Sequence, residues 1–309
     1  MILVVLGLFL FETVSSIDNA IINAQVLGTM SERAKRWFLT WGLFFAVFVV
    51  RGILPWMIVW AATPSLGPIG SLTATFSNDP SVQEAVERSA PILLLGGGIF
   101  LVFLFFHWLF MEEKEYALPW ERFFHARGVW FYAVVSIILS SVVWFALQEN
   151  PMAAFGAVVG STVFFITHGF KQQAEESERK LLHSGGKSFS DISKLLYLEA
   201  IDTTFSIDGV LGAFAFTFSV PLILLGNSLG ALAVRQFTIG NIERLKRYSL
   251  LKNGAMYSVL SLGTIMLLEG FGTHVSPAIA PLITFVVVGF FFWKSYVAIK
   301  KQDVLVVSK

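Results

Sequence analysis

The segment FETVSSIDNAI, residues 11–21, places two acidic side chains inside an apolar N-terminal stretch. Residues 1–28 around it are otherwise mostly apolar, and at about 1.5 Å per residue they are long enough to cross a bilayer as a helix. A charge at the bilayer centre costs at least roughly 2.5 kcal/mol, so such residues usually mark a functional site. Glu12 and Asp18 therefore predict a polar site within a membrane.

The same pattern returns later in the chain. Residues 202–210, DTTFSIDGV, repeat residues 12–20, ETVSSIDNA, with acid matched to acid at the start and Ser-Ile-Asp matched further on. Each motif is followed by an apolar segment that carries one arginine, Arg51 in the first case and Arg235 in the second. The chain therefore contains an internal repeat, an architecture that is common among secondary transporters.

Composition places the whole chain in a bilayer. Of the 309 residues 55% are hydrophobic and 14% are charged, whereas soluble domains carry about 25% charged residues. Apolar stretches of about 20 residues predict an all-α, polytopic membrane protein with about nine transmembrane helices. We expect these helices near residues 2–28, 37–62, 90–111, 128–147, 151–170, 195–219, 221–241, 254–271 and 279–299.

Basic residues predict the orientation, because Lys and Arg near helix ends favour the cytoplasmic side. The expected connections on one side of the membrane, together with the C-terminal tail, hold 19 of the 22 Lys and Arg residues. We expect a bacterial inner (plasma) membrane protein with its N-terminus outside and its C-terminus in the cytoplasm. The first and sixth helices then run in opposite directions, so the repeats are inverted. The chain is expected to contact the lipid bilayer, its net charge of +1 is uninformative about other partners, and no nucleic-acid-binding module is recognisable.

The repeat divides the chain into two membrane halves. Residues 1–170 form the first half, with an external loop at 63–90, and residues 195–309 form the second. The mixed-charge stretch at 171–194 is expected to be a solvated cytoplasmic linker between them. The glycine run at 96–98 is expected to permit close helix packing.

Helix periodicity limits how the acids of the first motif can converge. On an ideal helix Glu12, Ser16 and Asn19 share one face, whereas Asp18 follows Glu12 by six residues and points about 120° away. Only a local break would turn both acids towards one ion. Serine and asparagine compete for backbone hydrogen bonds, so we expect a distorted helix at 15–19.

The second motif repeats this arrangement. Asp202 and Ser206 share a face, and Asp208 follows Asp202 by six residues. A second distortion is therefore expected at 203–209, and carbonyl oxygens freed at both breaks would be additional ligands.

The chemistry of these side chains suggests the ion. Carboxylate, amide and hydroxyl oxygens suit hard divalent cations such as Mn²⁺, Ca²⁺ and Mg²⁺, and the chain has no cysteine. Clustered carboxylates repel one another without a cation, so metal ions and protons should compete for the site. The expected metal ligands are Glu12, Asp18, Asn19, Asp202 and Asp208, with Ser16 and Ser206 as auxiliary ligands and Arg51 and Arg235 as charge balance.

The motifs that contain Glu12 and Asp208, together with NSLGALAVR at residues 227–235, resemble the TerC family of integral membrane proteins, which lies near the LysE-type exporters. The resemblance covers most of the transmembrane chain and is that of a divergent branch. It implies that the acidic motif residues are functional and that a metal ion is the substrate, since some members are implicated in manganese efflux. Gly209 departs from the pattern, because many relatives have serine there.

These observations predict a secondary transporter, not an enzyme, that exports a divalent metal cation, with manganese as the first candidate and proton antiport as the coupling that the competition suggests. The ion is the transported substrate, and no other cofactor is expected. The alternatives are a metal-binding membrane scaffold or sensor linked to tellurium or metal stress resistance, and a membrane metalloenzyme, which the absence of an HExxH-type signature disfavours. Of the histidines, His107 is expected to pack between helices and His168 to lie at a membrane interface.

Overall fold

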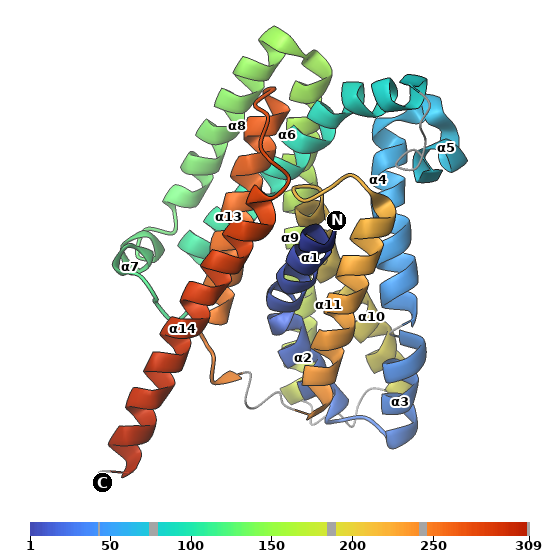
Figure 1. The fold of residues 1–309 in the computed structure, drawn as a ribbon. Helices are drawn as coiled ribbons and strands as arrows, with labels where there is room; N and C mark the ends of the chain where they lie inside the picture. Colours follow the sequence, from blue (N-terminus) through green and yellow to red (C-terminus); the bar gives the residue numbers. More distant parts are fainter. Residues whose placement is uncertain (43, 74–79, 184–189, 241–245, 308–309) are drawn as a thin grey trace.

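The computed structural model describes residues 1–42, 44–73, 80–183, 190–240 and 246–307, and all regular structure in these ranges is helical (Figure 1). The all-helical prediction is therefore confirmed. Within these ranges four helices are long and apolar enough to cross a membrane, or up to six if each of two bent helix pairs is one span. These helices indicate a membrane-embedded protein, and the count of nine spans stays a prediction.

Each of the nine predicted ranges contains helical structure, but several helices begin or end at other residues than predicted. α9 continues to His183, so the start of the predicted linker at 171–194 is helical, and α6 begins at Pro80 inside the predicted loop at 63–90. The elements are α1 (Ile2–Ser15), α2 (Ile17–Leu27), α3 (Glu32–Trp37), the π-helical segments η1 (Phe38–Gly42) and η2 (Phe45–Ile53), α4 (Leu54–Ala62), the 3₁₀ turn η3 (Pro64–Leu66), α5 (Gly67–Thr73), α6 (Pro80–Met111), α7 (Pro119–His125), α8 (Trp130–Glu149), α9 (Pro151–His183), α10 (Asp191–Ala213), α11 (Val220–Gly240), α13 (Leu251–Gly270) and α14 (Ile279–Val307).

The N-terminal span is broken inside the first acidic motif. α1 ends at Ser15 and α2 begins at Ile17, and the two segments are bent by 53° relative to each other. Ser16 at the junction has φ −91° and ψ 7°, which lies outside the regular helical range. The predicted distortion at 15–19 is therefore confirmed.

The predicted distortion at 203–209 is wrong, because α10 runs as one helix from Asp191 to Ala213. The hydroxyl groups of Thr203, Thr204 and Ser206 each donate a hydrogen bond to the backbone carbonyl four residues earlier. Side chains that bond back to their own helix in this way need not interrupt it.

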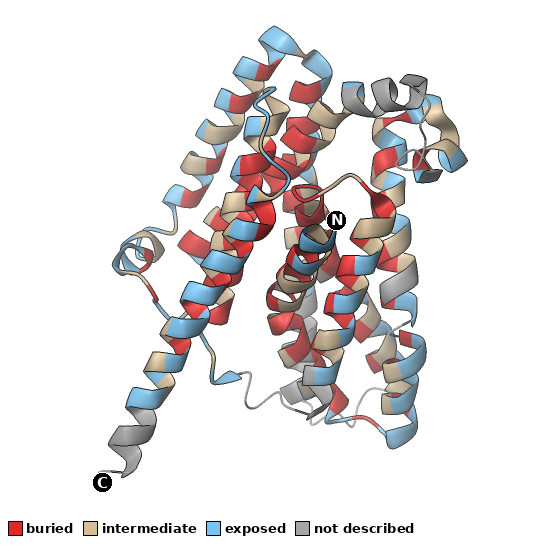
Figure 2. Cartoon of the chain, viewed as in Figure 1, coloured by how far each residue is buried: buried red, intermediate tan, exposed pale blue. Residues whose placement is uncertain are grey.

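The centre of the core is α6, which packs against α9 and α13. In its apolar span 83% of the residues are buried, compared with 22% in the spans of α8 and α14, whose exposed sides are visible in Figure 2. Glycines bring α6 and α9 into backbone contact, since a Cβ atom on Gly160 would lie 2.0 Å from the carbonyl oxygen of Gly96. The prediction that the glycine run at 96–98 permits close packing is confirmed.

Several connections between helices lie at two opposite ends of the molecule. The α2–α3 connection and the end of α14 lie at the lower end in Figure 1, whereas the α8–α9 and α13–α14 connections lie at the upper end. α3 at the lower end carries three of the basic residues on which the orientation is based: Arg33, Lys35 and Arg36.

Candidate functional site

The first acidic motif forms a buried ion pair with the first arginine. The Nε and Nη2 atoms of Arg51 donate hydrogen bonds to Oε1 of Glu12 over 2.9 and 2.6 Å. The Ser16 hydroxyl donates to the same oxygen over 3.0 Å. Glu12 is 1% exposed and Arg51 is 2% exposed, so both charges are removed from solvent and each depends on the other for compensation.

The second acidic motif joins the same network. Nη1 of Arg51 lies 3.6 Å from Oδ2 of Asp202, and the side-chain amide of Asn19 donates a hydrogen bond to Oδ1 of Asp202. Arg51 therefore lies between the first acid of one motif and the first acid of the other. The two segments that resemble each other in sequence meet at one guanidinium group.

Two departures from regular α-helix position these groups. Arg51 belongs to the π-helical segment η2, where its Nη1 atom donates to the carbonyl oxygen of Ala46 over 3.2 Å. π-Helical turns inside α-helices are rare and are frequent at functional sites. On the opposite side, the break at Ser16 lets Glu12 in α1 and Asn19 in α2 reach the same arginine network.

Glycines make room for the Glu12 side chain. A Cβ atom on Gly209 of α10 would lie 2.4 Å from Oε2 of Glu12, and a Cβ atom on Gly230 of α11 would lie 2.6 Å from its Cβ atom. Only glycine fits these close approaches without displacing the glutamate. Gly209, the position at which the sequence departs from the TerC pattern, thus has no space for a side chain in this structure.

The remaining space in this network is small. A cavity of about 20 Å³, room for little more than one water molecule, lies among Ser16, Asn19, Arg51, Asp202 and Arg235. Arg235 lines it, but its guanidinium lies over the ring of Phe38, 4.0 Å from the ring centroid. Ser206 directs its hydroxyl to the carbonyl oxygen of Asp202.

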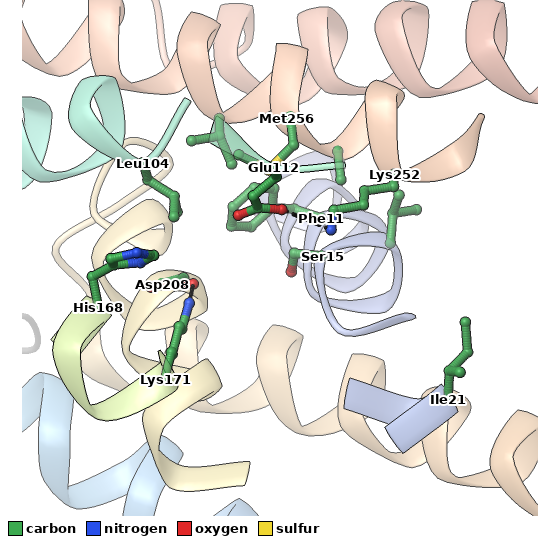
Figure 3. Close-up of a pocket in the computed structure, with 13 residues that line it drawn as sticks. Phe11, Ser15, Ile21, Leu104, Glu112, His168, Lys171, Asp208, Lys252 and Met256 are labelled. Atoms are coloured by element: carbon green, nitrogen blue, oxygen red, sulfur yellow. Dashed lines mark hydrogen bonds and ion pairs between the residues drawn. The ribbon is translucent and has the colours of Figure 1, made fainter. Parts of the chain in front are cut away.

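Asp208 lies apart from this network. Its carboxylate accepts a hydrogen bond from Lys171 of α9 in a second cavity of about 300 Å³, which Figure 3 shows. Because α10 is unbroken, the offset of six positions from Asp202 to Asp208 turns the second acid to another side of the helix. The structure therefore does not bring Asp208 to the expected ion site.

The predicted site is assembled in part. Five of the predicted residues share one network: Glu12, Ser16, Asn19, Arg51 and Asp202. The side chain of Asp18 lies outside the described part of the chain. Among the residues whose positions are described, no three His, Cys, Asp or Glu side chains are grouped as a metal site, and the place between Glu12 and Asp202 is taken by Arg51.

Several residues of the second cavity are not part of the predicted site. Glu112 pairs with Lys252 over 2.8 Å, and His168 and Lys171 line the same cavity. The charge pattern predicts a solvated linker that includes Lys171, and it predicts that Glu112 and Lys252 lie in connections between helices. These residues lie outside both acidic motifs, so the sequence does not predict that they line one cavity.

Comparison with known proteins identifies a family. A family model described as "Protein of unknown function (DUF475)" matches residues 17–302, which is most of the chain. No curated protein and no solved structure matches the chain significantly. The match includes most of the network described above and adds no activity to it.

Proposed function

Since the chain belongs to the DUF475 family, whose description assigns no activity, we propose a function from the network itself: the protein is a membrane transporter that exports a divalent metal cation. The ion binds between Glu12 and Asp202 in a conformation in which Arg51 has withdrawn. Manganese is the first candidate. The observation that carries this proposal is the position of Arg51 between the two acids.

Charge supports the exchange of arginine for a metal ion. Two carboxylates carry two negative charges, of which one guanidinium compensates one and one divalent cation compensates both. Arg51 makes the stronger contact to Glu12, at 2.6 Å, and the weaker one to Asp202, at 3.6 Å. The arginine thus holds the site together while no ion is bound, and its departure would leave a strongly attractive site for a cation.

The ligand types support a hard cation. The carboxylates of Glu12 and Asp202 and the amide oxygen of Asn19 are oxygen ligands, which suit Mn²⁺, Ca²⁺ and Mg²⁺. The amide oxygen of Asn19 is buried and accepts no hydrogen bond in the described part of the protein. It is therefore available as a ligand without the loss of an existing bond.

The surroundings support transport in particular. Carboxylates inside a membrane usually mark an ion pathway, and broken helices at such a site are typical of transporters with repeated halves. The break at Ser16 and the π-helical segment around Arg51 both lie at the network. We further propose an inner-membrane location with the N-terminus outside, an inverted repeat and exchange of the metal for protons.

The test is metal uptake into proteoliposomes. We expect Mn²⁺ uptake by the wild-type protein, with Ca²⁺ measured in parallel, and a loss of at least about tenfold in Glu12→Gln and Asp202→Asn. Glu269→Gln, at the end of α13 and away from the network, is the matched acid control and should keep its uptake. Ion binding without uptake by wild-type protein would favour the scaffold or sensor, and neither binding nor uptake would refute the proposal.

A further inference from the structure

Glu199 of α10 carries a carboxylate that is buried without a partner. Both of its oxygen atoms are shielded from solvent, and neither accepts a hydrogen bond in the described part of the protein. Leaving a buried polar group without a hydrogen bond is unfavourable, and native proteins do so at few positions. Glu199 was not among the expected ligands, although it lies close to them in the sequence. Its surroundings indicate which group could pair with it in another conformation.

On α10, Glu199 precedes Asp202 by one helical turn. The helix is unbroken here, and residues three positions apart on a helix are neighbours on one face, with about 5–6 Å between their Cβ atoms. Oδ2 of Asp202 lies 3.6 Å from Nη1 of Arg51. The unpartnered carboxylate is therefore about one turn away from an acid that already contacts the guanidinium group.

The segment that carries Arg51 leads to the same carboxylate. Nη1 of Arg51 donates a hydrogen bond to the carbonyl oxygen of Ala46, so the side chain points towards the start of η2. Gly42 precedes Ala46 by four positions, and a Cβ atom on Gly42 would collide with Oε1 of Glu199. On this side, too, about one helical turn, or roughly 5 Å, separates the present place of the guanidinium from Glu199.

Metal binding between Glu12 and Asp202 would leave Arg51 in need of a new partner. The ion would take the two carboxylates that now compensate the guanidinium. Arg51 and a divalent cation together carry three positive charges, whereas the two acids carry two negative ones. A buried guanidinium without a counter-charge is strongly unfavourable. The carboxylate of Glu199 would supply the third negative charge.

We propose that Glu199 binds the guanidinium of Arg51 while the metal ion occupies the site, and releases it to the two acids of the network when the ion leaves. This inference rests on the proposed metal transport. Glu199 is then a positioning residue, which acts on the ion through Arg51 and does not touch the ion. Arg235 keeps its cation–π contact with the ring of Phe38 in both states.

The experiment measures metal affinity and metal-free stability in the same variants. For wild-type protein and Glu199→Gln in detergent, equilibrium dialysis gives the dissociation constants of Mn²⁺ and Ca²⁺, and thermal unfolding gives Tm with and without Mn²⁺. We expect Glu199→Gln to bind both ions about tenfold more weakly or worse, with the ratio of the two constants changed by less than about twofold. The rise in Tm that Mn²⁺ causes should shrink accordingly.

The metal-free protein provides the readout that separates this role from a structural one. Without metal, Tm of Glu199→Gln should equal or exceed that of wild-type protein, because the carboxylate has no hydrogen bond to lose. In Arg51→Met there is no guanidinium to bind, so adding Glu199→Gln should change the Mn²⁺ affinity by less than about twofold. Glu199→Asp keeps the charge and should bind Mn²⁺ more tightly than Glu199→Gln, which covers the case in which Arg51→Met does not fold.

The outcomes distinguish this inference from the proposed transport. Glu269→Gln is again the acid control and should bind Mn²⁺ as wild-type protein does. Unchanged Mn²⁺ affinity in Glu199→Gln, a lower metal-free Tm, or an equal loss of affinity when Glu199→Gln is added to Arg51→Met would overturn the role of Glu199 and leave the transporter proposal standing. Absence of Mn²⁺ and Ca²⁺ binding by wild-type protein would overturn both.

Discussion

The backbone of Gly209 lies directly against the carboxylate of Glu12, since a Cβ atom at position 209 would come within 2.4 Å of Oε2. The glutamate cannot simply move aside, because Arg51 and Ser16 hold its other oxygen. A methyl group at this position would therefore disturb the ion pair as well as the packing of α1 on α10.

We predict that Gly209→Ala destabilises the folded protein by roughly 1–3 kcal/mol, the usual cost of overpacking. Gly169→Ala is the matched control, because it lies in α9 with no atom within 4 Å of its added Cβ. That substitution should be neutral or stabilise by up to about 1 kcal/mol through helix propensity. Thermal unfolding in detergent measures both, and equal effects would show that the close contact carries no strain.

Removal of Arg51 should be costly and should couple to Glu12. Arg51→Met leaves two buried carboxylates without compensation, for which we expect a loss of about 3–5 kcal/mol. Adding Glu12→Gln should recover part of this loss, with a coupling energy of about 0.5–3 kcal/mol in a double-mutant cycle. Arg33→Met, on the exposed face of α3, should change stability by less than about 0.5 kcal/mol. Strict additivity of the two site substitutions would contradict the ion pair.

Glu112 should make stability depend on acid pH. Burial acts to raise the pKa of its carboxyl, but Lys252 and His107 outweigh this effect and hold the pKa below its usual value of 4.5. A lowered pKa in the folded state means stabilisation that is present above the usual pKa and lost as the pH falls towards the folded-state value. Glu112→Gln should therefore lower Tm at pH 7, by about 2–4 °C for each kcal/mol lost.

The difference between wild-type protein and Glu112→Gln should shrink as the pH falls below about 4.5. Glu149→Gln, at the exposed end of α8, provides the comparison at each pH. A Tm difference that stays constant from pH 7 to acid pH would mean that the carboxylate charge of Glu112 does not stabilise this region.

The absence of cysteine makes the orientation directly measurable. Thr29→Cys in the α2–α3 connection and Ser276→Cys in the α13–α14 connection place single thiols at exposed positions on opposite ends of the molecule. A membrane-impermeant maleimide added to intact cells should label Ser276→Cys at once, and Thr29→Cys only after permeabilisation. Labelling of Thr29→Cys alone in intact cells would reverse the proposed orientation.

Hydrophobicity predicts most of the helices, because apolar segments of the required length are unambiguous in this sequence. It does not predict the local geometry of the second motif. Ser16 breaks the first helix, whereas Ser206 bonds back to its own unbroken helix, although both lie in nearly the same local sequence. The packing of neighbouring helices decides whether the serine breaks its helix. The sequence of the motif alone does not contain information on that packing.

The candidate site is likewise predicted only in part from the sequence. Matching the two motifs predicts that Glu12 and Asp202 belong to one site, and the structure places both beside Arg51. The sequence does not predict that Lys171 pairs with Asp208. Lys171 lies 37 positions away, in a stretch whose charge pattern indicates a linker. His168 lies against His107 and lines a cavity, contacts that the sequence does not predict. Contacts between distant helices depend on their relative rotation, which composition does not record.

The backbone contact between Gly96 of α6 and Gly160 of α9 has a mechanical consequence. Two helices whose main chains touch have no side-chain layer that can be rearranged between them, so they form a fixed frame together with α13. We therefore expect that a movement of Arg51 away from the two acids would bend the chain where its geometry is irregular. These places are the junction at Ser16 and the π-helical segment η2. We therefore expect Glu12 and Asp202 to lie between a rigid part of the molecule and a part that bends.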